Sequence, residues 1–520
     1  MMSSATIETA PVEVLPVKGR EGNSYTQILK SSAWVGGSTV LNIAIGIVRT
    51  KVMAILLGPA GFGLNGLYSA VADVAQSVAG MGVNSSGVRQ IAESAGSGDR
   101  QRIAQTAAVL RRTSLALGFA GAVLLVIFSK QISSLTFGNA GRASAISLLA
   151  LAVFCKLVSA GQAALVQGMR RISDLAKMQI SGAVAGILTG IPLVYLWGQA
   201  GIVPALIAVA ASMLMTSWWY SRKIPVPRLR VGLAEIGHEA AALLKLGFAF
   251  MTSGFLTMGA AYSVRILLAR RAGIAATGYY QSAWTLGGLY VGIILQAMAA
   301  DFYPRLTASI RDHRVSNRIV NEQTEVGLLL AGPGVLGTLT FAPLILALFY
   351  SPKFYAAVEI LRWISLGTLM QVVSWPMGFI VLAKGRPSIF LASDLGWTIV
   401  YLGLAWFLVH NYGLEGAGMA FFASYLFHLL LNYAIARRLS GFRWSKSNRH
   451  TGVLFCGLIA LVFCALRLLP QTVSVSVGGI ALVGATWYSL SCFAQLVSAA
   501  QLPAPISRLL LAFHRRGDAA

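Results

Sequence analysis

The sequence predicts an all-α membrane protein of about fourteen transmembrane helices in two related lobes, with two further helices at the C-terminus. Composition is the first reason, because 56% of the 520 residues are hydrophobic and only 11% are charged. The mean hydropathy is +0.70. A single soluble core cannot bury that much apolar surface, so much of it must face lipid. The second reason is a repeated turn between apolar runs.

Runs of about 20 apolar residues are long enough to cross a bilayer as helices. Fourteen such runs occur, at 31–57, 61–83, 113–137, 143–166, 172–196, 200–220, 244–269, 275–300, 326–349, 357–383, 388–409, 414–436, 451–468 and 474–498. They predict five parts: a disordered cytoplasmic lead at 1–28, an N-lobe of six spans at 29–221, a cytoplasmic linker at 222–243, a C-lobe of six spans at 244–440, and two additional spans with a cytoplasmic tail at 441–520. The lead has no apolar run, which excludes a cleavable signal peptide.

Two similar turns, at 58–68 and 270–280, each join a pair of apolar runs. The second turn aligns on the first through three pairs: Ala60 on Ala272, Gly66 on Gly278 and Tyr68 on Tyr280. Internal duplication across spanning helices is typical of transporters. The pattern therefore predicts two related helical lobes.

The 41 Lys and Arg residues are distributed unequally between the two sides of the membrane. Assigning alternate connections to opposite sides places about 30 on the side of the N-terminus and about 6 on the other, which predicts that both termini are cytoplasmic. The net charge of +24 then reflects topology and contact with anionic lipids. Nucleic-acid binding is not expected, because the basic residues are spread over many short loops and form no single stripe.

The motifs of a metal or nucleotide site are missing. The four cysteines and six histidines show no ligand spacing, so no metal is expected. Residues 61–66 match G-x-G-x-x-G, but they lie between spanning helices and not after a strand, so we interpret them as a tight turn. No G-x-x-x-x-G-K-[ST] loop is present. We expect no cofactor, with an ion gradient or the membrane potential as the source of energy.

Ionisable residues inside the spans are the candidates for function. Five are basic: Arg49, Lys51, Lys156, Arg265 and Arg362. Three are acidic: Asp73, Asp301 and Asp394. Each cation facing lipid at the bilayer centre would cost about 2.5–3.5 kcal/mol. Pairing within a lobe, for example of Asp73 with Arg49, is one interpretation. The other is a cationic cavity, because the basic residues outnumber the acidic ones and leave positive charge for an anionic substrate.

On the second interpretation, Arg49 faces the cavity while Lys51, about 200° away around the helix, faces elsewhere. Asp73 and Asp301 are then candidates for ion or proton coupling. Tyr280 and Trp284 could stack on sugar rings, or could belong to an interfacial aromatic belt.

Four motifs resemble those of the Wzx-type O-antigen and lipid III translocases: 57–64 (LGPAGFGL), 264–269 (VRILLA), 278–284 (GYYQSAW) and 302–306 (FYPRL). The resemblance covers about residues 28 to 440 and places the chain in the multidrug, oligosaccharidyl-lipid and polysaccharide exporter superfamily. It implies two six-helix lobes facing each other across a central cavity. It also places Arg265 in the Arg-Ile-Leu motif and Arg305 in the Tyr-Pro-Arg-Leu motif, as substrate-binding residues. The two extra C-terminal spans are similar to those of the lipid II flippase branch.

The resemblance implies a flippase, not an enzyme, in the bacterial inner membrane. Its cargo would be an undecaprenyl-pyrophosphate-linked O-antigen or exopolysaccharide repeat unit, moved to the periplasmic leaflet by alternating access. A polysaccharide polymerase and a chain-length regulator are conceivable partners. We expect a monomer, because each lobe already has its partner within the chain.

Two other functions compete with this hypothesis. A cation-coupled multidrug antiporter of the same superfamily would be expected to carry a more acidic cavity. A membrane glycosyltransferase or polysaccharide polymerase would need a large loop or catalytic acids on one face, whereas the predicted outer loops are short. A structural scaffold would leave the duplicated lobes and the intramembrane charges without a cause.

Overall fold

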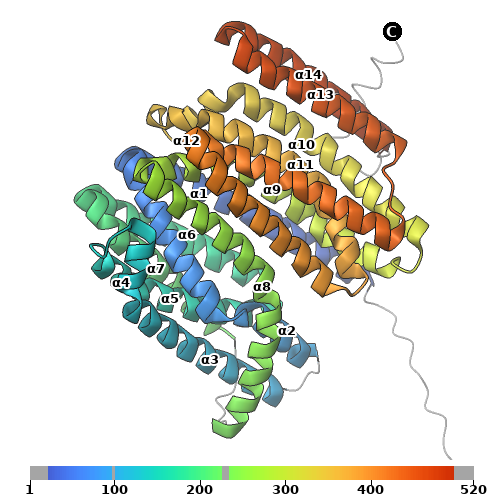
Figure 1. The fold of residues 1–520 in the computed structure, drawn as a ribbon. Coiled ribbons are helices and arrows are strands. Elements are labelled where there is room, and N and C mark those ends of the chain that lie inside the picture. The colour runs from blue at the N-terminus through green and yellow to red at the C-terminus, as the bar shows by residue number, and fades with distance from the viewer. Residues whose placement is uncertain (1–20, 97–99, 225–232, 497–520) are drawn as a thin grey trace, which may run out of the picture.

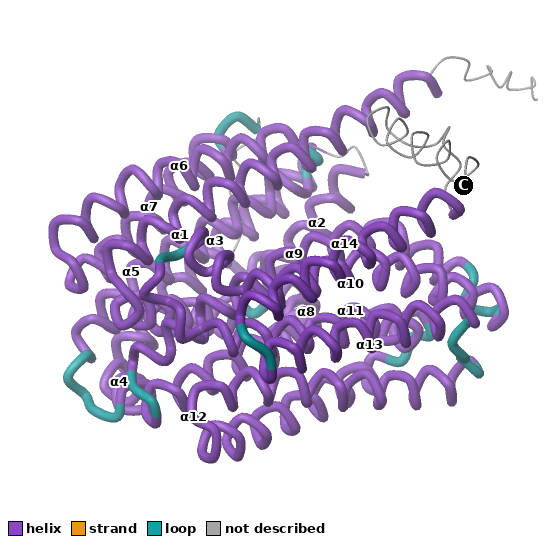
Figure 2. The backbone as a smooth tube through the Cα atoms, turned by 90° about the horizontal axis from the view of Figure 1, so that it is seen from above, coloured by secondary structure: helices purple, strands orange, loops and turns teal. Residues whose placement is uncertain are grey.

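The computed structural model describes residues 21–96, 100–224 and 233–496, and this part of the chain contains helices and no strand (Figures 1 and 2). The first bundle comprises α1 (Glu21–Gly80), α2 (Val83–Gly96), α3 (Arg100–Ile127), α4 (Ser129–Phe137), α5 (Ala143–Gly168), α6 (Ile172–Trp197), the 3-10 helix η1 (Gly198–Gly201) and α7 (Ile202–Ser221). The second bundle comprises α8 (Leu233–Arg271), α9 (Ile274–Ala308), α10 (His313–Phe349), η2 (Pro352–Ala357), α11 (Val358–Ala383) and α12 (Pro387–Ser440). The chain continues with α13 (Lys446–Leu468) and α14 (Gln471–Leu496).

Each predicted span overlaps one or two of these helices, although the span predicted at 474–498 ends outside the described residues. Some of the helices contain two spans. α1 has 60 residues, or roughly 90 Å of helix at 1.5 Å per residue, whereas the hydrocarbon core is only about 30 Å thick. It bends back at Gly58, where φ is 62°. α12 does the same at Gly413, where φ is 59°. Only glycine adopts these angles without strain, so each glycine allows two spans to meet in a tight turn.

Nine stretches of the described residues are long and apolar enough to cross a membrane, and the 54-residue stretch Pro387–Ser440 is one of them. Three of these stretches, Leu41–Gly80, Ile172–Ser221 and Pro387–Ser440, contain two spans each. When α8 and α9 are added, the total agrees with the predicted all-α membrane fold of fourteen spans.

Two predicted boundaries were wrong. α1 begins at Glu21, so residues 21–28 of the predicted disordered lead are helical, while residues 1–20 lie outside the described part. The predicted linker at 222–243 is also partly helical, because α8 begins at Leu233. In both places the helix begins before the apolar run that marks the span. A helix can continue past the bilayer surface wherever no residue breaks it, so the apolar run does not show where the helix starts.

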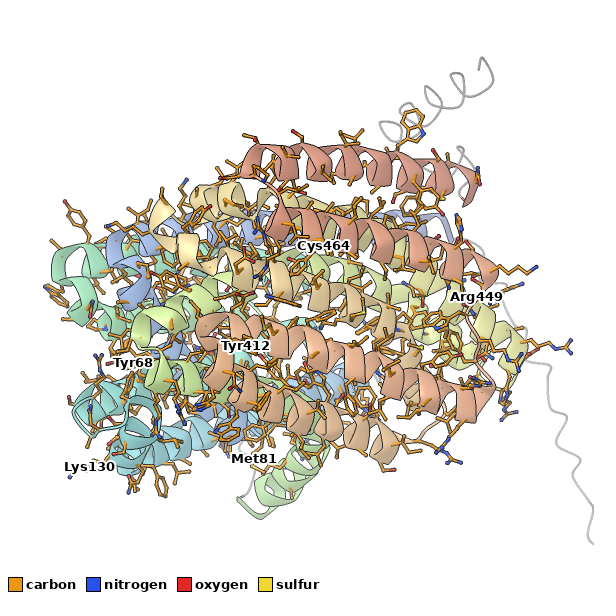
Figure 3. The ribbon with its side chains drawn as sticks, turned by 45° about the horizontal axis from the view of Figure 1, so that its top comes forward. Tyr68, Met81, Lys130, Tyr412, Arg449 and Cys464 are labelled. Carbon is orange, nitrogen blue, oxygen red and sulfur yellow. The ribbon has the colours of Figure 1, made fainter. Side chains whose placement is uncertain are left out.

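The two ends of the molecule differ in charge. We call one the basic end, because it holds the Arg170–Arg171 turn, the Arg222–Lys223 turn and the loop that leads to Arg449. The other, which we call the opposite end, holds the turns at Gly58 and Gly413. In Figure 3, Arg449 lies at the first and Lys130 at the second.

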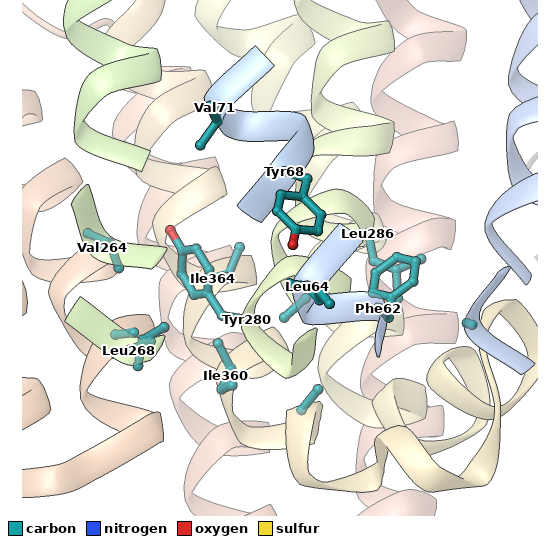
Figure 4. Packing of buried hydrophobic residues seen from close by; sticks show 14 of the residues in the cluster. Phe62, Leu64, Tyr68, Val71, Val264, Leu268, Tyr280, Leu286, Ile360 and Ile364 are labelled. Atoms are coloured by element: carbon teal, nitrogen blue, oxygen red, sulfur yellow. The ribbon is translucent and has the colours of Figure 1, made fainter. Parts of the chain in front are cut away.

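The largest hydrophobic cluster that both bundles share among the described residues lies at the opposite end. There, one cluster of buried residues includes Leu64 of α1, Ile146 of α5, Val264 of α8 and Ile360 of α11. At the basic end the two bundles have separate clusters, one around Leu110 and Ile91 and another around Phe302 and Phe442. The bundles are therefore held together mainly at the opposite end (Figure 4).

The additional helices α13 and α14 pack on α10 along the outer edge of the second bundle (Figure 1). At the basic end, the side-chain carbonyl of Asn321 accepts a hydrogen bond from the Ser445 backbone N–H at 2.8 Å, and the Asn448 amide donates to the Asn321 backbone carbonyl at 2.9 Å. At the opposite end, Arg467 of α13 forms ion pairs with Glu415 of α12 and, at 3.1 Å, with Glu359 of α11. Polar contacts thus fix α13 at both of its ends.

Replacing Arg467 by glutamine is expected to lower the free energy of unfolding by about 1 kcal/mol, because a partly exposed ion pair contributes little more than that. The measurement is thermal unfolding in detergent, with Lys446→Gln on the same helix as the control, since Lys446 is exposed. Equal unfolding temperatures for the two variants would show that the ion pairs do not hold α13 in place.

Candidate functional site

A cavity of about 310 Å³ lies between the first bundle and α8. The side chains that line it come from α1, α2, α3, α5 and α8. Those with polar groups are Asp73, Gln76, Ser77, Asn84, Ser85 and Ser114. Apolar side chains form another part of the wall, among them Leu157, Met251 and Met258. The cavity therefore combines hydrogen-bonding groups with an apolar surface at the junction of the two bundles.

The strongest charge interaction in this region joins α1 to α5. The Lys156 ammonium donates to the Asp73 carboxylate at 2.6 Å. Both side chains stay partly accessible, with exposed fractions of 30% for Lys156 and 43% for Asp73. The expectation that Asp73 pairs with Arg49 was wrong. The cation at this carboxylate is Lys156 of α5, and not Arg49 of the first half of α1. An accessible ion pair at a cavity wall can exchange partners with a charged ligand.

Arg265 of α8 is a second cation in this region, on the side of the second bundle. Its Nε donates to the side-chain carbonyl of Gln281 on α9 at 2.8 Å. Asp73 attracts this guanidinium electrostatically across the two bundles. Gln281 belongs to the same 278–284 motif that carried the family resemblance, but sequence reasoning did not select it, because an uncharged side chain gives a weaker intramembrane signal than an arginine.

The two candidate aromatic residues lie in the core of the second bundle. Tyr280 is completely buried, and its hydroxyl is 2.7 Å from that of Tyr401 on α12. Its ring is 5.8 Å from that of Trp284, which in turn meets Phe421 edge-to-face at 5.3 Å. Neither prediction for Tyr280 agrees with this burial, because no sugar ring can stack on a surface that is fully covered and an interfacial anchor would be exposed. Trp284 is only half-buried.

The other predicted cations are not brought together with this cavity. Arg362 is 10% exposed as a side chain and pairs with Glu359 at 2.5 Å. Its Nε also donates to the Leu339 carbonyl at 3.2 Å, so Arg362 belongs to the network that holds α11 beside α10 and α13. Its predicted role in the cavity is therefore not supported by its position. Sequence reasoning overlooked Glu359 because it stands at the edge of the predicted span.

Arg305 and Asp301 lie at the basic end of α9. Arg305 has an exposed side chain, 3.9 Å from the Glu322 carboxylate of α10. The Asp301 side chain lies outside the described part of the structure. Arg49 is half-buried on the first half of α1 and makes no hydrogen bond or ion pair with another described residue. Its role in binding stays a prediction.

At the opposite end of the molecule, the two duplicated turns seal the space between the bundles. A Cβ atom on Gly63 would lie 2.2 Å from the Ile274 carbonyl oxygen, and one on Gly278 would lie 2.0 Å from the Pro59 carbonyl oxygen. The backbones of α1 and α9 therefore touch at this point. Only glycine permits so close an approach.

Aromatic side chains extend the seal around these glycines (Figure 4). Phe62 meets Tyr350 edge-to-face at 5.4 Å and Phe354 at 5.7 Å. A short hydrogen bond of 2.5 Å joins Thr136 of α4 to Tyr262 of α8. Access to the cavity from the opposite end is thus closed by direct contacts between the bundles.

At the basic end, α8 makes one close contact with the first bundle. A Cβ atom on Gly82 would lie 2.0 Å from the Gly247 carbonyl oxygen. Met81 and Gly82 both have positive φ, at 44° and 66°, and form the bend between α1 and α2. α8, a helix of the second bundle, therefore also packs against the first, and it borders the cavity through Met251, Gly254 and Met258.

A two-bundle helical membrane protein with a charged internal cavity, closed at one end, has the architecture of a transporter of the multidrug, oligosaccharidyl-lipid and polysaccharide exporter superfamily. The chain belongs to the polysaccharide biosynthesis protein family, whose pattern matches residues 52–359. The resemblance of its motifs to the Wzx-type translocases is thereby confirmed.

Individual relatives agree with this placement. The chain is 24% identical over 418 residues to the lipid III flippase of Escherichia coli K12, an alignment that covers 78% of this chain and 97% of the relative. Among solved structures, an inward-facing multidrug resistance MATE family transporter gives a TM-score of 0.66 at 19% identity, covering 77% of this chain and 95% of that one. The lipid II flippase MurJ in an inward closed conformation gives 0.65 at 14% identity, covering 90% and 99%. The predicted fold is confirmed by both.

Proposed function

We propose that this protein is a flippase that moves an undecaprenyl-pyrophosphate-linked oligosaccharide, such as an O-antigen or exopolysaccharide repeat unit, from the cytoplasmic to the periplasmic leaflet. The observation that carries the proposal is the Asp73 carboxylate, which lines the cavity between the bundles, pairs with Lys156 at 2.6 Å and interacts electrostatically with Arg265. Two cations around one anion leave a positive site of the kind that a pyrophosphate requires. The lipid III flippase relative favours the same class of cargo.

The pyrophosphate would be held by charge-assisted hydrogen bonds. An arginine can donate to two phosphate oxygens at once, whereas a lysine acts as a point charge. Arg265 belongs to the second bundle and Lys156 to the first, so one pyrophosphate between them would draw the bundles together. The glycan would occupy the polar part of the cavity, and the prenyl chain would remain in the bilayer beside it.

Alternating access would then exchange the seal at the opposite end for a seal at the basic end. The basic end faces the cytoplasm in this proposal, because positive residues are retained there. Both termini are then cytoplasmic, in a multi-pass protein of the bacterial inner membrane. The present contacts correspond to a state that is closed toward the periplasm.

Energy would come from an ion gradient or the membrane potential, without a cofactor. Asp73 is the residue best placed for coupling, because protonation of its carboxylate would release Lys156 to bind the substrate. The protein acts as a monomeric transporter and not as an enzyme in this proposal, and it hands its product to a polysaccharide polymerase whose chain lengths a separate regulator would set.

The fold of the MATE transporter keeps a multidrug antiporter as the second candidate. A cavity for cationic drugs needs an excess of acidic groups, whereas Asp73 is the one acid among the described lining residues and is already paired with Lys156. The charge of the site therefore favours an anionic substrate.

The test is the movement of a fluorescent undecaprenyl-pyrophosphate glycan between leaflets of proteoliposomes. The parent chain is expected to translocate it, while Arg49→Ala and Lys156→Ala lose most of the activity. Lys130→Ala is the matched control, because Lys130 is exposed at the opposite end, away from the cavity. A folded parent that exports cationic dyes and leaves the glycan in place would overturn the proposal in favour of the antiporter.

A further inference from the structure

A second cavity, of about 630 Å³, lies within the first bundle and adjoins the first cavity at Ser114 and Gly161. Its wall comes from α3, α5 and α7 together with the residues that follow α7. α5 packs against both α3 and α7 and forms its floor. The volume is within the roughly 300–1,000 Å³ that is typical of small-molecule sites.

The lining of this cavity combines apolar side chains with a cluster of arginines and three uncharged polar residues, Ser114, Gln162 and Ser221. Small and aliphatic side chains form most of the lining, among them Ala107 of α3 and Val158 and Leu165 of the α5 floor. Arg111 and Arg112 of α3 and Arg222 after α7 also line it, and none of its described lining residues is acidic. Three positive charges therefore border a pocket that has an apolar floor.

Three contacts hold Arg222 and the residues around it in place. The Arg222 guanidinium lies over the Trp218 ring, 4.2 Å from its centroid. Arg171 donates to the Lys223 carbonyl at 2.9 Å and pairs with Asp174 at 2.6 Å. The neighbouring carboxylate is thus already engaged by its own arginine, and the charge of Arg222 remains available to a ligand.

The residues around the cavity have the composition of the level where lipid headgroups meet acyl chains. Arg222 directly follows the end of α7 at the basic end, and Trp218 is 45% exposed one turn deeper. On α3, Leu115 and Phe119 follow Arg111 and Arg112 and are 38% and 67% exposed. Large apolar side chains exposed along a spanning helix face acyl chains, whereas arginines at the interface attract anionic headgroups.

We propose that this cavity binds an anionic diacyl phospholipid. Its headgroup phosphate would lie between Arg111 and Arg222, and its chains would lie against the exposed apolar faces of α3 and α7. A free phosphate would gain the charge interaction but not the apolar contact. The two cavities share Ser114 and Gly161, but the three arginines line this one and are not among the described lining residues of the other, so the proposal does not depend on the identity of the cargo.

The test compares phosphatidylglycerol with phosphatidylcholine of the same acyl chains, added to the purified full-length protein in detergent. Native mass spectrometry measures the bound lipid, and thermal unfolding measures the stabilisation. Phosphatidylglycerol is expected to bind more tightly and to raise the unfolding temperature. Each cation near the surface contributes roughly a fivefold gain in affinity, so Arg111→Gln with Arg222→Gln should weaken binding roughly 25-fold.

The control is Arg438→Gln, which removes the same charge from an exposed position at the basic end of α12. It should leave the phosphatidylglycerol affinity unchanged, and the unfolding temperature without lipid shows whether each variant is folded. Equal affinity for the two lipids, or equal losses in the control and the double variant, would overturn the proposal. So would displacement of the lipid by millimolar inorganic phosphate, since that would reveal a general anion site.

Discussion

Replacing Gly278 by valine is expected to lower translocation of the lipid-linked glycan more than tenfold. An added Cβ would lie 2.0 Å from the Pro59 carbonyl oxygen and 3.0 Å from the Gly63 backbone nitrogen. Both contacts are with backbone atoms, so no change of rotamer can relieve them. A cost of roughly 3 kcal/mol, at the upper end of the usual range for overpacking, would disfavour the sealed state more than 100-fold. A transporter that cannot close at this end cannot alternate.

The seal itself can be measured with a cysteine at Ala357, which is fully buried beside it. The reporter requires replacement of the four free cysteines, Cys155, Cys456, Cys464 and Cys492. A membrane-impermeant thiol reagent should label this cysteine slowly in the parent and rapidly in the Gly278→Val variant. Gly288→Val is the control on the same helix, because a Cβ there meets no atom within 4 Å. Slow labelling and normal transport in both variants would mean that the glycine contact is dispensable.

The duplicated turns thus acquire a physical role that the alignment alone did not reveal. The sequence showed that Gly278 corresponds to a glycine of the first turn, but not that the two turns touch. Their contact follows from the approximate symmetry of the bundles, because equivalent turns lie at the same end of the molecule and close on one another. The aromatic residues Phe62 and Phe354 then fill the space around them.

The spans were predictable because the bilayer imposes a simple requirement. A segment that crosses lipid must satisfy its backbone hydrogen bonds internally and must be apolar over about 20 residues. Both properties can be read locally, which is why the turns at Gly58 and Gly413 were located correctly. The ends of α1 and α8 were not, since in water a helix is extended by its own propensity and by tertiary contacts.

The pairing of charges could not be predicted in the same way. Asp73 and Lys156 are 83 residues apart in sequence, and their meeting depends on how α1 and α5 are rotated about their axes. The same limit applies to Arg362, whose hydrophobic surroundings suggested a cavity but whose partner Glu359 is one helical turn away. Composition identifies intramembrane charges, whereas packing decides which of them face a ligand.

The contacts that α8 makes with the first bundle also depend on packing. Near the opposite end Val264 joins the core shared by both bundles, and near the basic end Leu244 packs against the separate core of the first bundle. The backbone contact between Gly247 and Gly82 lies in this second region. α8 therefore contacts the first bundle at both ends, and it must release one of these contacts when the cavity opens.

Neutralising the cavity ion pair is expected to separate a structural role of Lys156 from a role in binding. Lys156→Gln and Asp73→Asn each remove one charge and leave the other without its partner at 2.6 Å. Each should lower the free energy of unfolding by about 1 kcal/mol, the usual value for a partly exposed pair. The double variant should recover most of this stability, because it leaves neither charge unpaired.

Transport should respond differently from stability. If Lys156 holds the pyrophosphate, translocation falls more than tenfold in Lys156→Gln and remains low in the double variant, even though its unfolding temperature is restored. Measuring both quantities on the same preparations, with Lys130→Gln as the charge control, distinguishes the two roles. A double variant that transports as fast as the parent would assign the ion pair to packing alone. The positive charge of Arg265 would then have to bind the anion without help from Lys156, since it is the other cation that interacts electrostatically with Asp73.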